Sequence, residues 1–583
     1  MKPDDAQVVL HADDLGFSRG TNAGIHEAAE RGLLSSSSLL ANGPAFEQAV
    51  RETIPACSGM GVGVHLNLTE GPTLTRLGSG SLLGGSDGRF RASFGSLLAR
   101  SRASSLRAEI EQELRAQIEQ VLSRLTVVDH LNSHEHVHAI PSIFELVCRL
   151  AGDYEIPFVR LPRESAAVAL AGAEARPWYT LNLVKVGVLD ALAEFNSRTA
   201  SRLETRVNDW FIGVAHTGRM DAEAAIAGLA ALPNESAGVA ELLFHPAVAI
   251  ADRAERYVSA RARDRTLEPQ RRQELEALCD QRLASQIERL GLAVTCFGCL
   301  SGRSDHDHQV RVGAPAVPKR ISKPPPLRTF AIVDDDPLYH PTYLQRLVCE
   351  CEDIELVGAA VVRRPGGTGP ERYMRSQIRR LRPSELFRLS IKQVGPLLRR
   401  RFQADPPGSA VTATLARHGV PARIVASVND EHFLDHVRGF APDLVLSSNS
   451  LIFKPPLLEL PRITCINRHS ALLPAYGGVL PVFRAVQKGE PFAGVSVHRM
   501  VPGIDEGEVL ARRWIPIYPG DSLQHLYEIC YQLSFDVTAE AAARLRSDPQ
   551  APGLDDEGLT PSYYSWPDEA DWEEFRARGG RLA

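Results

Sequence analysis

Short apolar runs alternate with amphipathic stretches through the first three hundred residues. Four of the runs contain or end in polar side chains suited to binding a ligand: 7–11 (QVVLH), 62–68 (VGVHLNL), 127–138 (VVDHLNSHEHVH) and 241–246 (ELLFHP). Runs of this length are typical of buried strands. Helical patterns lie between them, over residues 22–31 and 106–125. Strand and helix in alternation predict an α/β fold for residues 1–303, either a parallel (β/α) barrel-like domain or a doubly wound sheet.

The second half repeats the alternation with different spacing. Buried-strand runs occur at residues 328–333, 354–362, 443–448 and 463–467. A helical stretch between the first two predicts the βαβ opening of a Rossmann-like domain, which we place at residues 328–515. No G-x-G-x-x-G follows the first run, and this argues against a bound dinucleotide. We expect residues 516–583 to form a small, helical C-terminal extension and tail.

A proline-rich segment, residues 304–327, separates the two halves. Its core, residues 313–326, reads GAPAVPKRISKPPP. Proline fixes φ and has no backbone donor, so we expect an extended, solvated linker. A chain of 583 residues is also too long for one hydrophobic core. The sequence therefore predicts two domains joined by a flexible segment.

The composition argues against several classes of protein. Hydrophobic residues make up 44% and charged residues 23% of the chain, as in ordinary globular proteins. A net charge of −6 argues against general nucleic-acid binding, and we expect no DNA partner. The first residues lack the apolar core of a secretory signal, and no apolar run reaches membrane-spanning length. Nine cysteines without framework spacing fit a reducing compartment, so we expect a cytoplasmic protein.

The polar ends of the first-half strands supply the residue types of a metal-dependent hydrolase. One carboxylate and two imidazoles can hold a divalent ion with one position open. A second carboxylate can then take a proton from water, and a further histidine can protonate a leaving group. Each residue also has a structural interpretation, because adjacent aspartates often form turns and strand histidines often belong to the core. Spacing alone does not say which of His134, His136 and His138 would be the ligand.

Four segments in the first half resemble the successive motifs of the YdjC-type carbohydrate deacetylases. They are residues 11–18 (HADDLGFS) with 22–25 (NAGI), 63–72 (GVHLNLTEGP), 130–138 (HLNSHEHVH) and 241–246 (ELLFHP). The resemblance implies a barrel-like fold and metal-dependent removal of an N-acetyl group. It implies that Asp14, His65 and His134 hold the metal, zinc or magnesium, that Asp13 is the base, and that His245 is the acid. Asn132 stands where the family usually has aspartate, a departure that we expect to matter little.

In the second half, an amide, an imidazole and a carboxylate suit formyl transfer. Asn467 and His469 are two residues apart on a predicted strand, so both project to one side. An amide can donate to the oxyanion of a tetrahedral intermediate, and an imidazole can accept a proton from an attacking amine. Asp505 lies in a predicted tight turn and could orient that imidazole. An asparagine and a histidine after a strand, taken alone, are more often part of a structural turn.

The surrounding residues resemble 10-formyltetrahydrofolate-dependent formyltransferases, which include methionyl-tRNA, glycinamide-ribotide and sugar-amine enzymes. The matching segments are 467–478 (NRHSALLPAYGG), 494–500 (GVSVHRM) and 503–507 (GIDEG). The resemblance implies a catalytic role for Asn467, His469 and Asp505, with 10-formyltetrahydrofolate as formyl donor. Two departures concern the acceptor: Gly477 replaces an arginine common in the tRNA enzymes, and the first strand ends in Asp334–Asp336 instead of a glycine-rich loop.

A basic insertion, residues 372–402, interrupts the second half. It carries nine arginines and one lysine against the single acid Glu385, interleaved with apolar residues. One interpretation is a peripheral contact with the inner face of a membrane or with a lipid-linked sugar diphosphate. The alternatives are a solvated basic face, a contact between domains, or an RNA surface.

The two predicted reactions are complementary. Removing acetyl from an amino sugar leaves a free amine, and formyl transfer requires one. We therefore expect a bifunctional enzyme that deacetylates and then N-formylates an amino sugar or glycoconjugate, either nucleotide-linked or lipid-linked. One alternative is a formyltransferase for aminoacyl-tRNA fused to an independent deacetylase. Another is that one half is a non-catalytic binding module.

Overall fold

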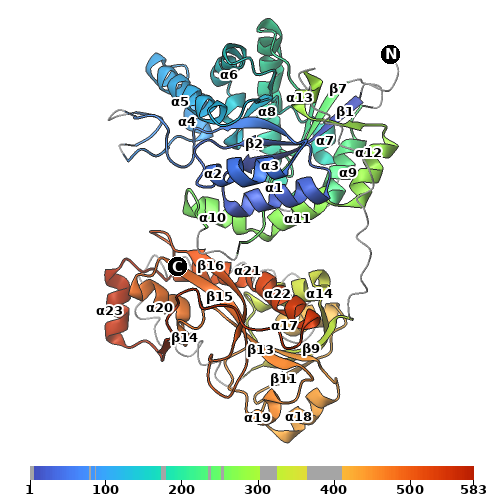
Figure 1. Cartoon of the computed structure of the whole chain (residues 1–583), viewed down its shortest axis with the longest axis vertical. Coiled ribbons are helices and arrows are strands. Elements are labelled where there is room, and N and C mark those ends of the chain that lie inside the picture. The colour runs from blue at the N-terminus through green and yellow to red at the C-terminus, as the bar shows by residue number, and fades with distance from the viewer. Residues whose placement is uncertain are drawn as a thin grey trace. The chain divides into compact units, whose positions relative to one another are not determined.

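The chain forms two compact units, seen in the computed structural model of Figure 1. The structure describes residues 6–77, 81–85, 87–171, 179–233, 238–250, 255–301, 325–363 and 410–582. The first unit comprises Met1–Val248 and Ala254–Pro318, and the second comprises Ala249–Arg253 and Lys319–Ala583. Most of the predicted linker at 304–327 and all of the basic insertion at 372–402 lie outside the described residues.

The first unit is built on a parallel sheet in the order β5-β4-β3-β2-β1-β7-β6, with β8 paired to β1. Its strands are β1 (Ala6–Leu15), β2 (Ser36–Leu39), β3 (Gly61–Leu66), β4 (His130–Ser133), β5 (Phe158–Val159), β6 (Trp210–Ile212), β7 (Gly238–Phe244) and β8 (Ala293–Val294). The two ends of this sheet approach each other, because Phe158 forms a bridge with Arg206 and Phe211 N–H donates to the Arg163 carbonyl at 3.0 Å. These contacts curve the sheet toward a barrel, but the strand order stays open between β5 and β6 among the described residues, and we call this form a half-barrel. The prediction of a barrel-like α/β fold is confirmed.

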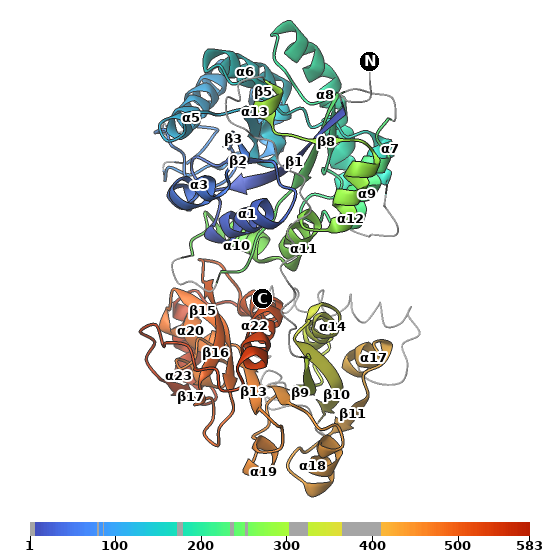
Figure 2. The same ribbon diagram turned by 45° about the vertical axis from the view of Figure 1, so that its right-hand side comes forward.

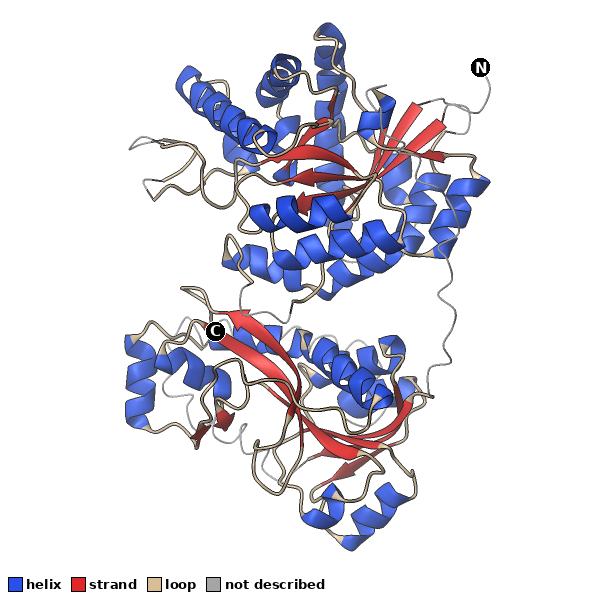
Figure 3. Cartoon of the chain, viewed as in Figure 1, coloured by secondary structure: helices blue, strands red, loops and turns tan. Residues whose placement is uncertain are grey.

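Helices follow the strands and cover the sheet of the first unit (Figure 3). They are α1 (Arg19–Arg31), α2 (Phe46–Gln48), α3 (Ile54–Ala56), α4 (Phe94–Arg100), α5 (Ser104–Leu122), α6 (Pro141–Asp153), α7 (Ala166–Leu170), α8 (Tyr179–Arg202), α9 (Ala222–Ala230), α10 (Ala260–Leu267), α11 (Pro269–Leu278), α12 (Gln281–Arg289) and α13 (Phe297–Leu300), with a π-helical turn η2 (Ala49–Thr53) and a 3₁₀ turn η3 (His134–Ala139). Helices α1 and α11 lie side by side (Figures 1 and 2). The buried apolar faces of these helices join the inner strands in one core.

One predicted strand is longer than the strand in the structure. The alternating histidines of residues 127–138 follow the two-residue period of a strand, but β4 ends at Ser133 and η3 begins at His134. Glu135 and His136 have φ values of 53° and 56°, in the left-handed region. The Ser133 hydroxyl accepts from the backbone N–H of His138 at 2.9 Å, so a local hydrogen bond closes the turn. The three histidines consequently do not share one face.

The second unit contains a twisted, mostly parallel sheet in the order β11-β10-β9-β12-β13-β15-β16. Its strands are β9 (Leu327–Asp334), β10 (Ile354–Val362), β11 (Ala422–Val425), β12 (Leu444–Ser448), β13 (Thr464–His469), β15 (Phe492–Arg499) and β16 (Val509–Pro516), and a separate two-stranded ladder pairs β14 (Gly477–Gly478) with β17 (Tyr563–Tyr564). Strands β15 and β16 run antiparallel to their neighbours. From β9 the chain passes to β10 and β11 on one side and then returns to β12 on the other side of β9, as in Rossmann-like folds. The predicted fold class is confirmed.

The helices of the second unit pack on both faces of this sheet. They are α14 (His340–Glu350), α17 (Ala410–Arg417), α18 (Glu431–Arg438), α19 (Pro455–Leu458), α20 (Pro481–Lys488), α21 (Leu523–Gln532), α22 (Ser534–Ser547) and α23 (Glu569–Ala577). Helix α22 packs against β15 and β16. Helices α18 and α19 contribute Phe433, Leu434 and Leu457 to a core with β9, β10 and β12. Among the described residues, no helix combines the length and apolar character needed to cross a bilayer.

Candidate functional sites

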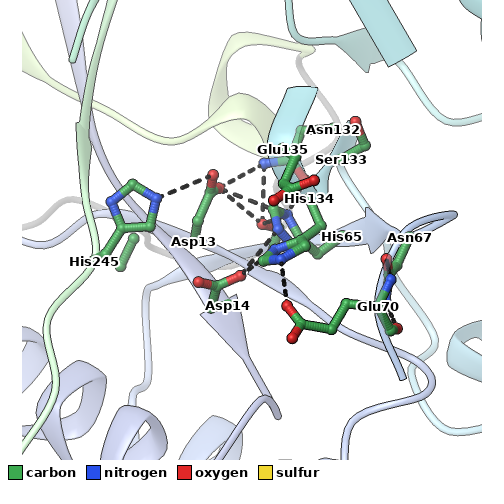
Figure 4. Close-up of polar contacts among 12 residues, drawn as sticks. Asp13, Asp14, His65, Asn67, Glu70, Asn132, Ser133, His134, Glu135 and His245 are labelled. Carbon is green, nitrogen blue, oxygen red and sulfur yellow. Dashed lines mark hydrogen bonds and ion pairs between the residues drawn. The ribbon is translucent and has the colours of Figure 1, made fainter. Parts of the chain in front are cut away.

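The first cluster lies where neighbouring parallel strands end. Asp13 and Asp14 are near the end of β1, His65 is on β3, His134 directly follows β4, and His245 directly follows β7. These strands are close neighbours in the sheet order, so the five side chains converge at one edge (Figure 4). Carboxyl ends of parallel strands are the usual place for ligands in such folds. All five residues predicted for the first half are brought together there.

Three of them form a compact group suited to a metal ion. Asp14 Oδ1 lies 3.2 Å from His65 Nε2 and 3.0 Å from His134 Nδ1. One ligand atom from each residue lies within 4.8 Å of the others. Asp14 has a φ of 70°, a backbone conformation that costs energy for a non-glycine residue and concentrates at functional sites. Histidines 136 and 138 are buried elsewhere: the His136 ring packs against Phe211, and His138 Nε2 lies 3.0 Å from the Arg160 carbonyl.

Asn132 determines which nitrogen of His65 faces this group. The Asn132 amide nitrogen donates to Asp13 Oδ1 at 2.9 Å, so its carbonyl oxygen must be the atom 2.8 Å from His65 Nδ1. His65 Nδ1 therefore carries the proton, and Nε2 presents a lone pair. That Nε2 atom is buried and has no hydrogen-bond partner among the described residues. An imidazole fixed in this way by a partner on its other nitrogen is the arrangement of a metal ligand, and the residues fit a divalent ion.

The charge of the pocket also suits a cation. Burial lowers the pKa of His134, but Asp14 and Glu70 outweigh it and raise that pKa to about 9. Glu70 Oε2 lies 3.4 Å from His134 Nε2. The pKa of Glu70 falls to about 2, because its contacts with His134 and Arg265 outweigh burial. Asp14 and Glu70 are therefore ionised beside His134, and a bound cation would take the place of the proton on that imidazole.

Asp13 is held by a buried arginine. Arg160 on the segment after β5 donates from two nitrogens to the Asp13 carboxylate, both at 2.9 Å, and its Nε donates to Glu241 at 2.8 Å. Burial would raise the pKa of Asp13, but Arg160, His65 and His11 lower it well below its usual range. Asp13 is therefore ionised, with one carboxylate edge facing the metal group and its geometry fixed by Arg160.

His245 lies at the opposite side of Asp13 from the metal group (Figure 4). Its Nε2 is 4.0 Å from Asp13 Oδ2, and its Nδ1 is 3.6 Å from Glu274 Oε2. The backbone N–H of His245 also donates to Glu274. The His245 imidazole therefore lies between the carboxylates of Asp13 and Glu274.

A second cluster lies in the other unit, on β13 and in the turn after β15. His469 Nε2 is 3.6 Å from Asp505 Oδ2. Burial lowers the pKa of His469, while Asp505 opposes that shift. The imidazole is therefore neutral near pH 7 and able to accept a proton. Asp505 is ionised, because His469, His498 and the Gly478 N–H lower its pKa against the effect of burial.

His498 joins the two other members of this cluster. Its Nδ1 donates to the Arg499 carbonyl at 2.8 Å, so its Nε2 accepts from the Asn467 side-chain nitrogen at 3.2 Å. The same Nε2 lies 3.6 Å from Asp505 Oδ1. One N–H of the Asn467 amide is thereby anchored, and the other is left to donate to a reacting group. Asn467, His469 and Asp505, the predicted residues of the second half, thus lie around one point.

Most of the residues that support these groups were not singled out from the sequence, and Asn132 is the exception. The set comprises Glu70, Asn132, Glu135, Arg160, Glu241, Arg265 and His498, and all make the contacts of buried or half-buried polar groups. Glu70, Asn132, Glu135, Glu241 and His498 stand inside the motifs quoted above, which is the signal that could have found them. Arg160 and Arg265 stand outside those motifs, and only folding places them here.

The sequence matches two protein families. Residues 7–289 match the YdjC-like protein family, and residues 397–538 match the formyl transferase family. A carbohydrate deacetylase of Brevibacillus brevis is 39% identical over 158 residues, which are 27% of this chain and 59% of that protein. A methionyl-tRNA formyltransferase of Citrifermentans bemidjiense is 33% identical over 159 residues, 27% of this chain and 49% of that protein. The chain thus spans only about half to three fifths of these relatives.

Solved structures give weaker similarities. A crystal structure of an Enterococcus faecalis protein is 22% identical, with a TM-score of 0.38, and the match covers 51% of this chain and 99% of that one. A sugar N-formyltransferase from Shewanella is 17% identical, with a TM-score of 0.28, covering 43% and 87%. The ranges of the two family matches, by contrast, include the residues of the two clusters described above. The chain therefore joins a YdjC-like domain, residues 7–289, to a formyl transferase domain, matched over residues 397–538.

Proposed function

We propose that this protein replaces the N-acetyl group of an amino sugar or glycoconjugate with an N-formyl group, in two reactions. The first unit hydrolyses the acetamide, and the second formylates the amine that is released. One observation carries the proposal: the chain holds two separate polar clusters, and the chemistry of the first produces the group that the second consumes.

In the first reaction, water adds to the amide carbonyl, the C–N bond breaks, and acetate and a free amine leave. A divalent ion held by Asp14, His65 and His134 supplies Lewis acidity toward the amide carbonyl and water. Asp13 accepts a proton from the attacking water, and Arg160 keeps its carboxylate in place. His245 delivers a proton to the leaving nitrogen. Zinc or magnesium is the expected metal, and two imidazoles favour zinc over magnesium.

In the second reaction, the amine attacks the formyl carbon of 10-formyltetrahydrofolate. A new N–C bond forms, the bond from the formyl carbon to N10 breaks, and tetrahydrofolate leaves. The free N–H of Asn467 donates to the oxyanion that forms on the formyl oxygen. His469 takes the proton that the attacking nitrogen loses and passes it to N10 as tetrahydrofolate leaves, and Asp505 stabilises the imidazolium in between.

Covalent linkage of the two units raises the effective concentration of the second site for the product of the first. The direct test incubates the full chain with a panel of N-acetylated amino sugars, a divalent metal and 10-formyltetrahydrofolate. Mass spectrometry should detect a product lighter than the substrate by one methylene. Accumulation of free amine across the panel, with no formylated product, would contradict the proposal.

A second candidate is formylation of an aminoacyl-tRNA, with deacetylation as an unrelated activity. It is favoured by the identity of 33% to a methionyl-tRNA formyltransferase. Gel-shift and formylation assays with aminoacyl-tRNA at physiological salt distinguish the two, because phosphate contacts dominate tRNA binding and weaken with salt. Tight binding and formylation of the tRNA, with no reaction on amino sugars, would favour this candidate.

A further inference from the structure

The segment after α22 forms part of the formyltransferase cluster. Strand β17 pairs with β14, with Gly477 opposite Tyr563 and Gly478 opposite Tyr564. Gly477 N–H donates to the Ser562 carbonyl and Val479 N–H to the Tyr564 carbonyl, both at 2.9 Å. The Gly478 N–H, on the other side of β14, donates to Asp505 Oδ2 at 2.8 Å. Asp505 is therefore held by β14, and β14 in turn pairs with β17 of the C-terminal extension.

This extension is firmly attached. Trp572 and Phe575 of α23 each lie with ring centroids 4.7 Å from the ring of Phe483 on α20. Arg484 forms a salt bridge with Asp571 at 2.7 Å and also donates to the Ser565 carbonyl. These contacts anchor the segment that directly follows β17, because they bury aromatic area and pair an arginine with a carboxylate.

The two tyrosines of β17 have different surroundings. Tyr564 stacks on Tyr476, with centroids 5.5 Å apart and an interplanar angle of 10°. Tyr563 points the other way, as successive strand residues do, and its side chain is 55% exposed. Its ring lies over the glycine pair: a Cβ on Gly477 would be 3.6 Å from Tyr563 Cδ2 and 3.5 Å from the Cβ of Asp505. The exposed ring of Tyr563 is thus close to Asp505. Gly477 leaves room for this arrangement, because a side chain at that position would come between the two.

We propose that Tyr563 is a wall of the acceptor site and stacks against the pyranose ring of the amino sugar. A hexosamine has an apolar face of C–H groups and a polar rim, which matches a tyrosine ring beside Asp505 and His469. Rigid aromatic side chains provide contact area at little entropic cost, so Tyr563 acts on acceptor binding and orientation. The inference rests on the proposed function, because it names the acceptor surface for that reaction.

The test measures formylation by the full chain with a supplied amino sugar, for the wild type, Tyr563→Ala and Tyr563→Trp. Tyr563→Ala should raise the KM for the amino sugar about tenfold and leave the KM for 10-formyltetrahydrofolate within about twofold, with kcat little changed. Tyr563→Trp keeps an aromatic face and should remain close to the wild type. Phe195→Ala is the matched control, because Phe195 is 53% exposed but lies on α8 of the other unit.

A second readout does not depend on turnover. Ring protons of glucosamine should shift upfield on binding the wild type, from the ring current of Tyr563, and not on binding Tyr563→Ala. Equal KM values for wild type and Tyr563→Ala, or an equal loss in Tyr563→Trp, would overturn this inference alone. Formylation of aminoacyl-tRNA by a wild type that neither binds nor formylates any hexosamine would overturn the proposed function, and this inference with it.

Discussion

Asn132 connects the proposed base of the first cluster to a proposed metal ligand. Its amide donates to Asp13 and accepts from His65, so one side chain orients both residues. Asn132→Ala should therefore lower metal affinity by about 10–100-fold, the usual effect of removing a residue that orients a ligand. Competition with a chromogenic chelator measures that affinity. Asn429→Ala, which removes a half-buried asparagine of the second unit, should leave it unchanged.

The pH dependence of formyl transfer should report His469. Burial lowers its pKa, so the acidic limb of kcat/KM is expected below pH 6.5, the ordinary value for histidine. Asp505 opposes this shift by stabilising the imidazolium. Asp505→Asn should therefore move the limb to still lower pH, in addition to reducing the rate. A limb that moves to higher pH in this variant would contradict the assignment of His469 as the proton acceptor.

The residue types of both clusters could be predicted from the sequence, but the supporting residues outside the motifs, Arg160 and Arg265, could not. Motif residues such as Asp14 and His469 lie at the ends of strands, and those strands are visible in the sequence as apolar runs. Arg160 reaches Asp13 only because β5 lies in the same half-barrel as β1 and β7. The substitution of asparagine at 132 for the family's usual aspartate was expected to matter little, yet that amide supplies the N–H that Asp13 accepts.

At the scale of elements, a substitution in β14 would show how far the C-terminal extension affects the rate of formylation. Gly478 has a φ of 92°, and a Cβ there would lie 2.2 Å from the Tyr564 carbonyl oxygen. Gly478→Ala should separate β14 from β17, displace the N–H that holds Asp505, and reduce formylation at least tenfold. Deacetylation should be unaffected.

Gly520→Ala is the matched control for that experiment. Gly520 has a nearly identical φ of 94°, but an added Cβ would meet nothing within 4 Å. It carries only the backbone strain of alanine in the left-handed region, about 1 kcal/mol. Similar losses of formylation in both variants would attribute the effect to strain and not to the β14–β17 contact.

Element boundaries show where sequence patterns mislead. The apolar runs predicted β1, β3, β7, β9, β10, β12 and β13 in the correct places, because buried parallel strands are continuous apolar segments. The run at 127–138 predicted too long a strand, because its histidines alternate as strand residues do. The hydrogen bond that the Ser133 hydroxyl accepts, together with the left-handed Glu135 and His136, turns the chain after β4. Strand β17 has only two residues, too few for any periodicity to be visible.

At the scale of the whole molecule, the two reactions should be separable. His134→Ala removes a proposed metal ligand and should abolish deacetylation while leaving formylation of a supplied amino sugar intact. His469→Ala should do the reverse. Chelation of the metal should reproduce the first variant only. Loss of both activities from either substitution, in a protein whose circular dichroism and melting temperature are unchanged, would contradict two independent sites.

The order of strands along the chain has a consequence for synthesis. The half-barrel is complete once β8 (Ala293–Val294) has been made, whereas the second sheet needs β16 and its cluster needs β17. Domains generally fold as they leave the ribosome. The proposed hydrolytic pocket can therefore mature on the nascent polypeptide while its downstream partner is still being translated. Ribosomes stalled in the second half would then carry the proposed deacetylating unit without the unit that acylates its product.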